Sequence, residues 1–494
     1  MNCRHRSISL GVGLWTAAWT LLGLSPRLAA QDRARQIDEL IGLYAGYGQF
    51  NGTALVAERG KVIYKKGTGF ANMEWKIPNR PETKFRIGSI TKSFTAFLIL
   101  QLAEQGKIRL EGKVSDYLPD YRKDIGERVT IHHLLTQTSG IQEFFQLPGF
   151  YEEAGRDRHG VEEFVKKYCG RWLRFEPGTR FEFSNSGYYL LGAVIERITG
   201  RSYEQALKAQ VLDPLGMKDT GLDDAAAIIT NRAAGYEKTM GGYINTPYLD
   251  MSVPYAAGAL YSTVEDLSIW DLALADDRLL GKEFKALLFR PYVEALGARY
   301  GYGWVIDKKK LSGSPDEVSC IWHGGVVHGF NSLMERYVDD GHLIILLNNT
   351  GTTYLYDLAA GVRDILYGRP YRRPGKSVAE ALQATLAVKG VGAAIEQYQE
   401  LKERRSGEYN FHVFELYRLG SGLLGKNRIK DAIAIFELNA KAHPGEPIVY
   451  DCLGQAYARS GDKWLAIKNY GKSLELDPGN IQAIERMREL LREE

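Results

Sequence analysis

The chain has 494 residues, of which 45% are hydrophobic and 25% charged, and its formal net charge is +3. This length exceeds what one compact core usually holds, so we expect two or more domains of an ordinary soluble globular protein. No long basic stripe accompanies the small net charge, which excludes nucleic acid as an expected partner, and the Arg372-Arg373 pair is interpreted as part of a solvated linker.

The first thirty residues have the pattern of an export signal. Arg4 and Arg6 form a positive start, an apolar stretch runs from Ile8 to Leu24, and the small pair Ala29-Ala30 precedes the expected cleavage point. We therefore expect residues 1–30 to be a signal peptide and the protein to be exported, either to a periplasm or out of the cell. The alternative is an uncleaved segment that anchors the chain to a membrane.

The next part of the chain reads as a mixture of helices and strands. A helix is expected over Ala34 to Tyr47, followed by a hairpin of Thr53 to Glu58 and Val62 to Lys66 that turns at Arg59-Gly60. From Ser89 the sequence turns helical and strongly apolar through Leu102.

A second β-rich block begins near Tyr302 and includes Leu343 to Leu347, and a helix over Tyr354 to Leu366 follows it. Strand-forming segments thus occur at both ends of residues 31–368, with helices between them. This order predicts one sheet that is assembled from N-terminal and C-terminal strands.

The cysteines and histidines do not predict a metal site. Once Cys3 is removed with the signal, Cys169, Cys320 and Cys452 remain at wide spacing, and we expect them to be small buried side chains. His323 is followed by His328, which is not a convincing metal pair. We therefore expect neither metal nor cofactor.

A segment rich in proline, glycine and charge, residues 369–377, is the expected linker, and residues 378–494 read as helix. This region contains a repeat with a period of 34 residues. The recurring residues are Leu419-Gly420, Ala432, Phe436 and Pro444, which return as Leu453-Gly454, Ala466, Tyr470 and Pro478. The period and the small residues between paired helices resemble the tetratricopeptide repeat. The tail either caps the first domain or binds a partner protein.

Ser89 and Lys92 form the strongest candidate for chemistry. Residues three apart on a helix share a face, so the two side chains meet if a helix begins at Ser89. The apolar run Phe94 to Leu102 describes a buried helix. Burial would lower the pKa of the lysine toward that of a usable base, which a serine hydroxyl needs before it becomes a nucleophile. A second Ser-x-x-Lys, Ser460 to Lys463, lies at a turn of the repeat and is interpreted as coincidence.

Several further segments follow Ser89-Ile90-Thr91-Lys92 in a fixed order. They are Leu134 to Gly140, Phe175 to Gly178, Ser184 to Gly192, Asp213 to Met217, Gly258 to Leu267 and His323 to Phe330. Together they resemble the serine β-lactamase-related family, in the branch of class C β-lactamases, D-alanyl-D-alanine peptidases and related esterases.

The resemblance implies an α+β fold, in which an antiparallel sheet flanked by helices lies beside an all-helical lobe, and the all-α tetratricopeptide-like region follows. It also implies an acyl-enzyme mechanism with Ser89 as nucleophile and Lys92 as its base. Asn185 would hold the substrate amide and position Lys92, and His323 would lie near the substrate carboxylate or leaving group. The Gly324-Gly325 pair would let the substrate backbone approach, and the backbone N–H groups of Ser89 and Val326 would form the oxyanion hole.

The sequence departs from the family pattern at its second motif. This branch usually has Tyr-x-Asn, with the tyrosine in proton transfer, whereas here the residues are Phe183-Ser184-Asn185. A phenyl ring cannot relay a proton, and the loss of such a group typically costs a factor of about 10²–10⁴ in rate. A literal Tyr-x-Asn occurs at Tyr243-Ile244-Asn245, so Tyr243 is a candidate for partial compensation.

Three functional hypotheses follow from these residues. The first is a serine hydrolase that acts on an amide, ester or β-lactam carbonyl of a small molecule or peptide. The second is a catalytically weak or inactive binding protein, in which the altered site senses a ligand and the helical tail engages a partner protein. The third is an interaction protein whose catalytic lobe serves as a scaffold. The intact Ser89–Lys92 pair favours the first hypothesis, and Phe183 favours the second.

Overall fold

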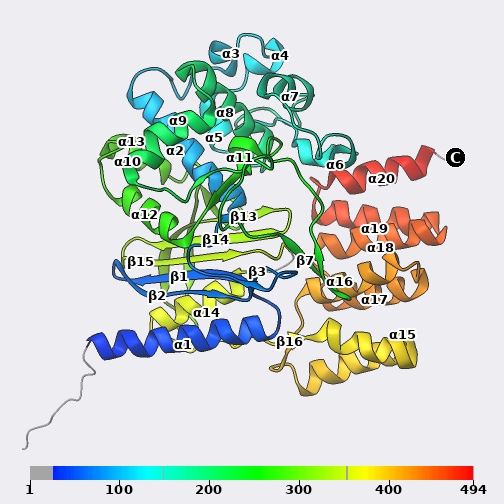
Figure 1. Cartoon of the computed structure of the whole chain (residues 1–494). Helices are drawn as coiled ribbons and strands as arrows, with labels where there is room; N and C mark the ends of the chain where they lie inside the picture. Colours follow the sequence, from blue (N-terminus) through cyan, green and yellow to red (C-terminus); the bar gives the residue numbers. More distant parts are fainter. Residues whose placement is uncertain (1–25, 148, 352–353, 493–494) are drawn as a thin grey trace, which may run out of the picture.

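The computed structural model describes residues 26–147, 149–351 and 354–492 (Figure 1). The apolar core of the expected signal, Ile8 to Leu24, lies outside the described residues. The expected cleavage point falls within the first helix, α1 (Pro26–Gly46). This helix covers the predicted one from Ala34 to Gly46, begins earlier, and ends one residue before the predicted end at Tyr47.

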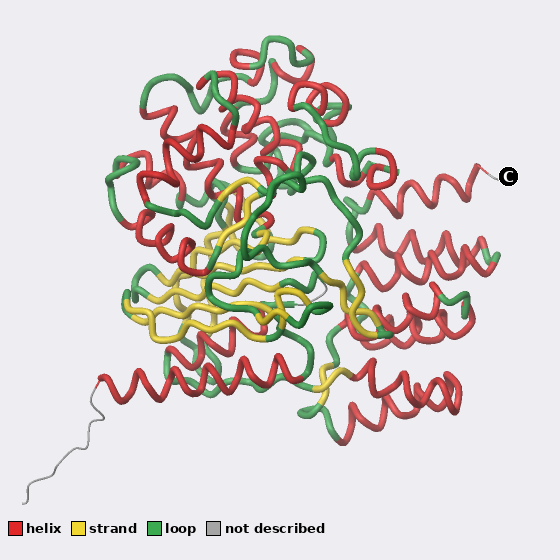
Figure 2. The backbone as a smooth tube through the Cα atoms, viewed as in Figure 1, coloured by secondary structure: helices red, strands yellow, loops and turns green. Residues whose placement is uncertain are grey.

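An eight-stranded antiparallel sheet forms the centre of residues 26–368 (Figure 2). Its strands, in spatial order, are β10 (Val293–Ala295), β11 (Ala298–Tyr300), β12 (Val305–Lys310), β13 (Glu317–Val327), β14 (Phe330–Tyr337), β15 (His342–Asn348), β1 (Gly52–Glu58) and β2 (Lys61–Thr68). Because β1 pairs with β15, strands from the two ends of this part of the chain meet in the sheet. The sequence prediction of a sheet assembled in this way is confirmed.

The hairpin between β1 and β2 turns where the sequence predicted. Both central residues have positive φ, 49° at Arg59 and 74° at Gly60. A two-residue turn with positive φ at both positions matches the twist of the flanking strands. This local requirement explains why Gly60 marks the turn in the sequence.

The sheet separates two hydrophobic cores. Along β15, Leu343, Ile345 and Leu347 belong to the core on one face, and Ile344 and Leu346 to the core on the other. This alternation follows from the two-residue period of a strand. A strand buried on both faces appears in the sequence as an uninterrupted apolar run.

Helices cover both faces. α1 and α14 (Tyr356–Leu366) cover the face that contains Ile344. The helical lobe on the other face contains α2 (Thr91–Glu104), α3 (Val114–Tyr117), α4 (Lys123–Gly126), α5 (Ile131–Leu135), α6 (Phe150–Glu153), α7 (Val161–Tyr168), α8 (Asn185–Thr199), α9 (Tyr203–Leu207), α10 (Asp213–Leu215), α11 (Tyr255–Gly258), α12 (Val264–Ala275) and α13 (Lys282–Leu288). A small sheet consists of the short strands β5 (Phe85–Arg86), β9 (Leu260–Ser262) and β6 (Gly221–Leu222). Two further pairs of strands are β3 (Phe70–Asn72) with β4 (Ile77–Pro78) and β7 (Tyr236–Thr239) with β8 (Gly242–Asn245).

The C-terminal helices, residues 378–492, are called the tail below. They are α15 (Val378–Arg404), α16 (Val413–Gly425), α17 (Ile429–Ala442), α18 (Pro447–Ser460), α19 (Lys463–Leu476) and α20 (Ile481–Arg492), preceded by β16 (Lys376–Ser377), which pairs with β17 (Tyr409–Asn410). Of the described helices, α15 has the length and apolar composition that could cross a membrane. It is broken at Gly390, where φ is 83° and ψ is 178°, and the chain folds back there (Figure 2).

Glycine and aromatic residues of the repeat meet between paired helices. A Cβ on Gly420 in α16 would lie 2.4 Å from the ring of Phe436 in α17, and a Cβ on Gly454 in α18 would lie 2.6 Å from Tyr470 in α19. Only glycine leaves room for the ring at either position. The 34-residue repeat therefore corresponds to the same packing contact made twice.

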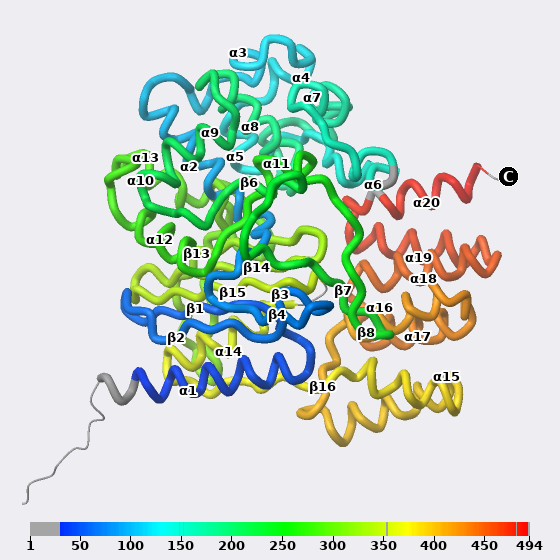
Figure 3. The backbone as a smooth tube through the Cα atoms, viewed as in Figure 1, coloured from blue at the N-terminus to red at the C-terminus, as the bar shows by residue number. Residues whose placement is uncertain are grey.

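The tail lies along one side of the sheet-containing part (Figure 3). Near its C-terminal end, Arg174 donates to the carbonyl of Gly479 at 3.2 Å. Near its start, Lys238 and Glu380 form an ion pair of 2.8 Å, and Met240 between β7 and β8 packs into the hydrophobic core of the tail. The contacts at both ends fix the tail beside the catalytic candidates described next.

Candidate active site

Ser89 and Lys92 lie at the start of a buried helix, where the sequence placed them. A short 3-10 turn, η1 (Gly88–Ile90), runs directly into α2, so both residues share one helical turn. The ammonium nitrogen of Lys92 lies 3.0 Å from Ser89 Oγ. It also donates to Asn185 Oδ1 at 2.7 Å and to the carbonyl of Ala257 in α11 at 2.8 Å. Lys92 is fully buried, whereas Ser89 is partly exposed.

The surroundings of Lys92 favour its neutral form. Burial lowers its pKa from 10.5 to about 7, and the Glu143 carboxyl group opposes part of this shift. A neutral amine has two N–H donors and one lone pair. Asn185 Oδ1 and the Ala257 carbonyl can accept the two donors, which leaves the lone pair for the hydroxyl of Ser89. This arrangement suits a general base.

Glu143 holds Asn185 in position and is a residue that the sequence reasoning missed. Asn185 is the first residue of α8, and its backbone N–H donates to Glu143 Oε2. Its side-chain Nδ2 donates to Glu143 Oε1 at 3.2 Å. Because the carboxylate accepts from Nδ2, the amide oxygen must face Lys92. Burial raises the pKa of Glu143. The available signal was a carboxylate beside two apolar residues, Phe144 and Phe145.

His323 lies in the wall of the same cleft as a neutral side chain. It is buried in β13, and burial together with the nearby Lys92 charge lowers its pKa to about 3. Its Nδ1 lies 2.6 Å from the Gly324 carbonyl, and its Nε2 lies 3.2 Å from the hydroxyl of Tyr300. In the tautomer that satisfies both contacts, Nδ1–H donates to the carbonyl and Nε2 accepts from Tyr300. His323 therefore does not offer the positive charge that would pair with a substrate carboxylate.

Phe183 lies directly above Lys92. The lysine nitrogen is 4.6 Å from the centre of the Phe183 ring, and the rings of Phe183 and His323 are 6.4 Å apart. A cation over an aromatic face is stabilised by the ring, which partly offsets the cost of burying it. The phenyl ring thus occupies the space beside Lys92 but brings no hydroxyl.

Glycines allow the backbone to close around Ser89. A Cβ on Gly325 would lie 1.9 Å from the carbonyl oxygen of Ile87, and one on Gly88 would lie 2.7 Å from the backbone nitrogen of Val326. β13 therefore lies directly against the segment that carries the serine. Gly325 provides this close approach, which places the N–H groups of Ser89 and Val326 on neighbouring segments.

A cleft of about 510 Å³ contains these groups. Ser89, Phe183, Asn185, Tyr300 and the β13 residues from Trp322 to Val327 contribute to its lining. Side chains of a strand alternate between its faces, so a consecutive run indicates that the backbone edge of the strand borders the cleft. Lys92 lies beneath this surface, in contact with Ser89.

The pairing of β13 agrees with an open edge at the cleft. Among the described strands, β12 pairs with β13 as far as Trp322, opposite Val305, whereas β14 pairs with it as far as Val327. The backbone from His323 to Val327 can therefore bind an extended chain by adding a strand.

Tyr243 lies elsewhere. It belongs to β8, its hydroxyl donates to the carbonyl of Gly48 at 3.3 Å, and it is not among the residues that line the cleft. The hairpin of β7 and β8 packs against the tail, which carries Tyr243 away from Ser89. The suggestion that Tyr243 compensates for Phe183 is therefore corrected, since the tyrosines that line the cleft are Tyr151, Tyr300, Tyr354 and Tyr356.

Within the described residues there is no group of three or more histidine, cysteine or acidic side chains that could hold a metal ion. Cys169, Cys320 and Cys452 are buried and unpaired as thiols, as the sequence predicted.

Comparisons with known proteins agree on one family for this part of the chain. The sequence matches the family described as Beta-lactamase over residues 35–368. It is similar to Penicillin-binding protein 4* of Bacillus subtilis (strain 168), with 30% identity over 391 residues that cover 74% of this chain and 84% of that protein.

Solved structures give the same result. The octameric penicillin-binding protein homologue from Pyrococcus abyssi has a TM-score of 0.59 at 28% identity, covering 72% of this chain and 81% of that chain. The D-amino acid amidase from Ochrobactrum anthropi SV3 has a TM-score of 0.58 at 25% identity, covering 68% of this chain and 98% of that chain.

Proposed function

We propose, since the chain belongs to the Beta-lactamase family, that it is a serine hydrolase which forms an acyl-enzyme through Ser89. The observation that carries the proposal is the environment of Lys92: a buried amine 3.0 Å from Ser89 Oγ, with a pKa lowered to about 7. The relatives named as penicillin-binding protein and D-amino acid amidase support a substrate with an amide, ester or β-lactam carbonyl.

In the proposed reaction, Ser89 Oγ attacks the carbonyl carbon and its proton passes to Lys92. The tetrahedral oxyanion is stabilised by the backbone N–H groups of Ser89 and Val326. The carbon–nitrogen or carbon–oxygen bond of the leaving group then breaks, and Lys92 returns the proton to that group. Water attacks the resulting ester, again with Lys92 as base, and releases a carboxylic acid and free Ser89.

The test is the intact mass of residues 31–494 after incubation with a fluorophosphonate and, separately, with a penicillin. We expect a mass increase that is absent from Ser89→Ala. A penicillin adduct that persists for hours would identify slow deacylation. Absence of any adduct in folded protein would count against the nucleophile and favour a ligand-binding role.

Phe183 supports the alternative of a weak hydrolase or ligand-binding protein, and its ring allows a direct test. We expect Phe183→Tyr to raise turnover of the acyl-enzyme by about ten- to a hundredfold, because it adds a hydroxyl beside Lys92 where proton transfer takes place. The measurement is the rate at which the penicillin adduct disappears. Phe175→Tyr, a partly exposed phenylalanine outside the cleft lining, is the matched control. An unchanged rate in Phe183→Tyr would show that proton transfer does not depend on a hydroxyl at this position.

The organisation of the chain is proposed on separate grounds. A catalytic domain over residues 31–368 is supported by the extent of the family match, and a tetratricopeptide-like domain over 378–494 by the repeated Gly420–Phe436 and Gly454–Tyr470 contacts. Export through residues 1–30 rests on the sequence pattern alone. That the tail binds a protein partner is proposed only as part of the alternative function, the weak hydrolase or ligand-binding protein.

A further inference from the structure

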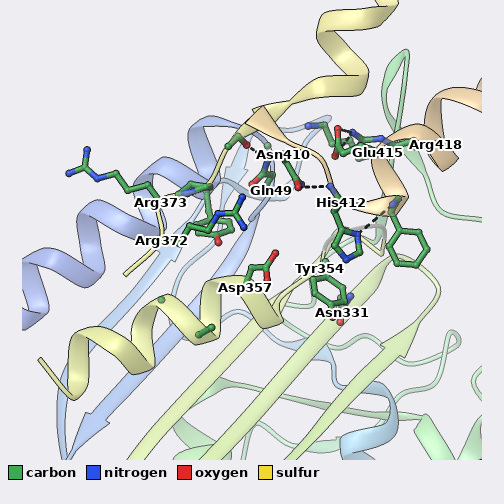
Figure 4. Close-up of a pocket in the computed structure, with 18 of the residues that line it drawn as sticks. Gln49, Asn331, Tyr354, Asp357, Arg372, Arg373, Asn410, His412, Glu415 and Arg418 are labelled. Carbon is green, nitrogen blue, oxygen red and sulfur yellow. Dashed lines mark hydrogen bonds and ion pairs between the residues drawn. The ribbon is translucent and has the colours of Figure 1, made fainter. Parts of the chain in front are cut away.

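A second cavity, of about 560 Å³, lies where the tail meets the sheet-containing part (Figure 4). Regions far apart in the chain contribute to its walls, among them Gln49 after α1, Asp357 in α14, Arg372 in the linker, and His412 and Phe414 at the start of α16. Neither the family domain nor the tail would form this cavity alone.

This cavity adjoins the catalytic cleft. Val326, Asn331, Gly351 and Tyr354 line both spaces. The side chain of Val326 is 68% exposed, and its backbone N–H belongs to the proposed oxyanion hole. A ligand whose carbonyl lies at Ser89 can therefore extend along the protein surface into the second cavity.

A series of aromatic rings connects the two spaces. Tyr356 contacts Tyr354 with ring centres 5.0 Å apart, Tyr354 contacts His412 at 5.1 Å, and His412 stacks on Phe414 at 5.3 Å. Tyr354 and Phe414 are 45% and 44% exposed. Exposed rings beside a cavity provide a large contact surface for a bound chain.

The lining of the cavity carries charged side chains of both signs. Lys238 pairs with Glu380, and Arg418 pairs with Glu415. Within the described residues no ion pair involves Arg372, which is exposed and projects into the cavity in Figure 4. Asp357 projects into the same space.

The adjacent Arg373 also lines the cavity, although its side chain extends away from it in Figure 4, and it adds positive charge. The linker interpretation explains why these arginines are exposed. It does not explain why Arg372 points into a cavity that adjoins the active-site cleft.

We propose that the tail completes an extended substrate site for a peptide. The scissile carbonyl lies at Ser89, the neighbouring backbone pairs with the open edge of β13, and the far segment crosses Tyr354 and Phe414. A carboxylate at its far end binds Arg372, and N–H donors beside it face Asp357. The open strand edge favours a peptide over a glycan, because it supplies backbone hydrogen bonds. This inference rests on the proposed acylation of Ser89.

The test measures how well peptides protect Ser89 from a fluorophosphonate. Hexapeptides are used, which span about 20 Å when extended. One pair differs only at the N-terminus, succinyl against acetyl, and a second pair differs only at the C-terminus, carboxylate against amide. In the pair whose varied end reaches Arg372, the anionic peptide should protect Ser89 of the wild type about tenfold better than the neutral peptide. A factor of this size is usual for one charge-assisted contact.

Variants separate this inference from the proposed function. Arg372→Glu should remove the preference for the anionic peptide, while its labelling without peptide stays at the wild-type rate. Arg201→Glu, an exposed arginine in the helical lobe, makes the same charge change and should keep the preference. Phe414→Ala should weaken protection by both members of the pair.

Three results would overturn the inference while leaving Ser89 acylation intact. The first is that the two members of each peptide pair protect Ser89 equally or not at all. The second is that Arg372→Glu keeps the preference for the anionic peptide. The third is that chitotetraose, a neutral glycan, protects Ser89 in a way that depends on Phe414 but not on Arg372. Failure of the wild type to label at all would instead remove the proposed function itself.

Discussion

Replacing Lys92 by methionine is expected to lower the rate of Ser89 acylation by a factor of about 10³–10⁴, near the upper limit for the loss of one general base. Methionine fills a similar volume but cannot accept the proton of the serine hydroxyl. The measurement is the second-order rate of fluorophosphonate labelling, followed by intact mass. Lys92→Arg should not restore the labelling rate, because a guanidinium stays protonated at neutral pH.

The same substitution should not destabilise the fold near pH 7. The folded-state pKa of Lys92, about 7, lies below its ordinary value of 10.5, so unfolding takes up a proton between these pH values. The lysine therefore makes the stability of the wild type rise with pH across this window. Methionine does not titrate, so Lys92→Met should melt no lower than the wild type near pH 7. Any gain in melting temperature of Lys92→Met over the wild type should become smaller as the pH approaches 10.

Lys107→Met provides the control, since Lys107 is exposed just beyond the end of α2. It should retain both the labelling rate and the melting behaviour of the wild type. Wild-type labelling in Lys92→Met would exclude Lys92 as the base. Loss of labelling together with a strongly lowered melting temperature would mean that the lysine is structural.

Replacing Glu143 by glutamine is expected to lower the acylation rate by about ten- to a hundredfold. The carboxylate accepts hydrogen bonds from the backbone N–H and the side-chain Nδ2 of Asn185 and from the backbone N–H of Phe145. A glutamine amide has one acceptor oxygen and brings donors of its own, so one buried N–H group loses its partner, at a cost of about 1–3 kcal/mol. Asn185 would then no longer hold its oxygen toward Lys92.

The pH profile separates this positioning role from a general loss of structure. In the wild type, labelling should increase with pH around an apparent pKa of about 7, the value of Lys92. The Glu143 carboxyl group raises the pKa of Lys92, so its removal should move the profile to lower pH. The expected result is a slower enzyme whose remaining activity persists at lower pH.

Glu335→Gln is the matched control for Glu143→Gln. Glu335 is a buried carboxyl group whose pKa is also raised by burial, but its partner is Tyr337 in β14. This variant should keep both the rate and the pH profile of labelling. A slower Glu143→Gln with an unshifted profile would leave Glu143 with a structural role only.

Features that depend on neighbouring residues could be predicted from the sequence. The β1–β2 turn needs positive φ at Arg59 and Gly60, and glycine marks such a turn. The Ser89–Lys92 contact follows from the helical spacing of residues three apart. The repeat could be found because Gly420 and Gly454 must each leave room for an aromatic ring in the next helix. In each case the constraint lies within one element or one pair of elements.

Features that join distant segments could not be predicted in this way. Glu143 meets Asn185 across two loops, Tyr300 meets His323 across the sheet, and Tyr243 is carried away from the cleft by its hairpin. A resemblance of motifs identified His323, but only the burial of the side chain decides that it is neutral.

The sequence by itself therefore determined the family and the neighbouring serine and lysine that are proposed as nucleophile and base, because these are encoded in short segments whose geometry is fixed by helix and strand periodicity. The tertiary structure decided the lowered pKa of Lys92, the contacts of Glu143 with Asn185 and the cavity between the tail and the cleft. Each of these depends on which distant groups displace water from a site, and no local spacing in the chain specifies that.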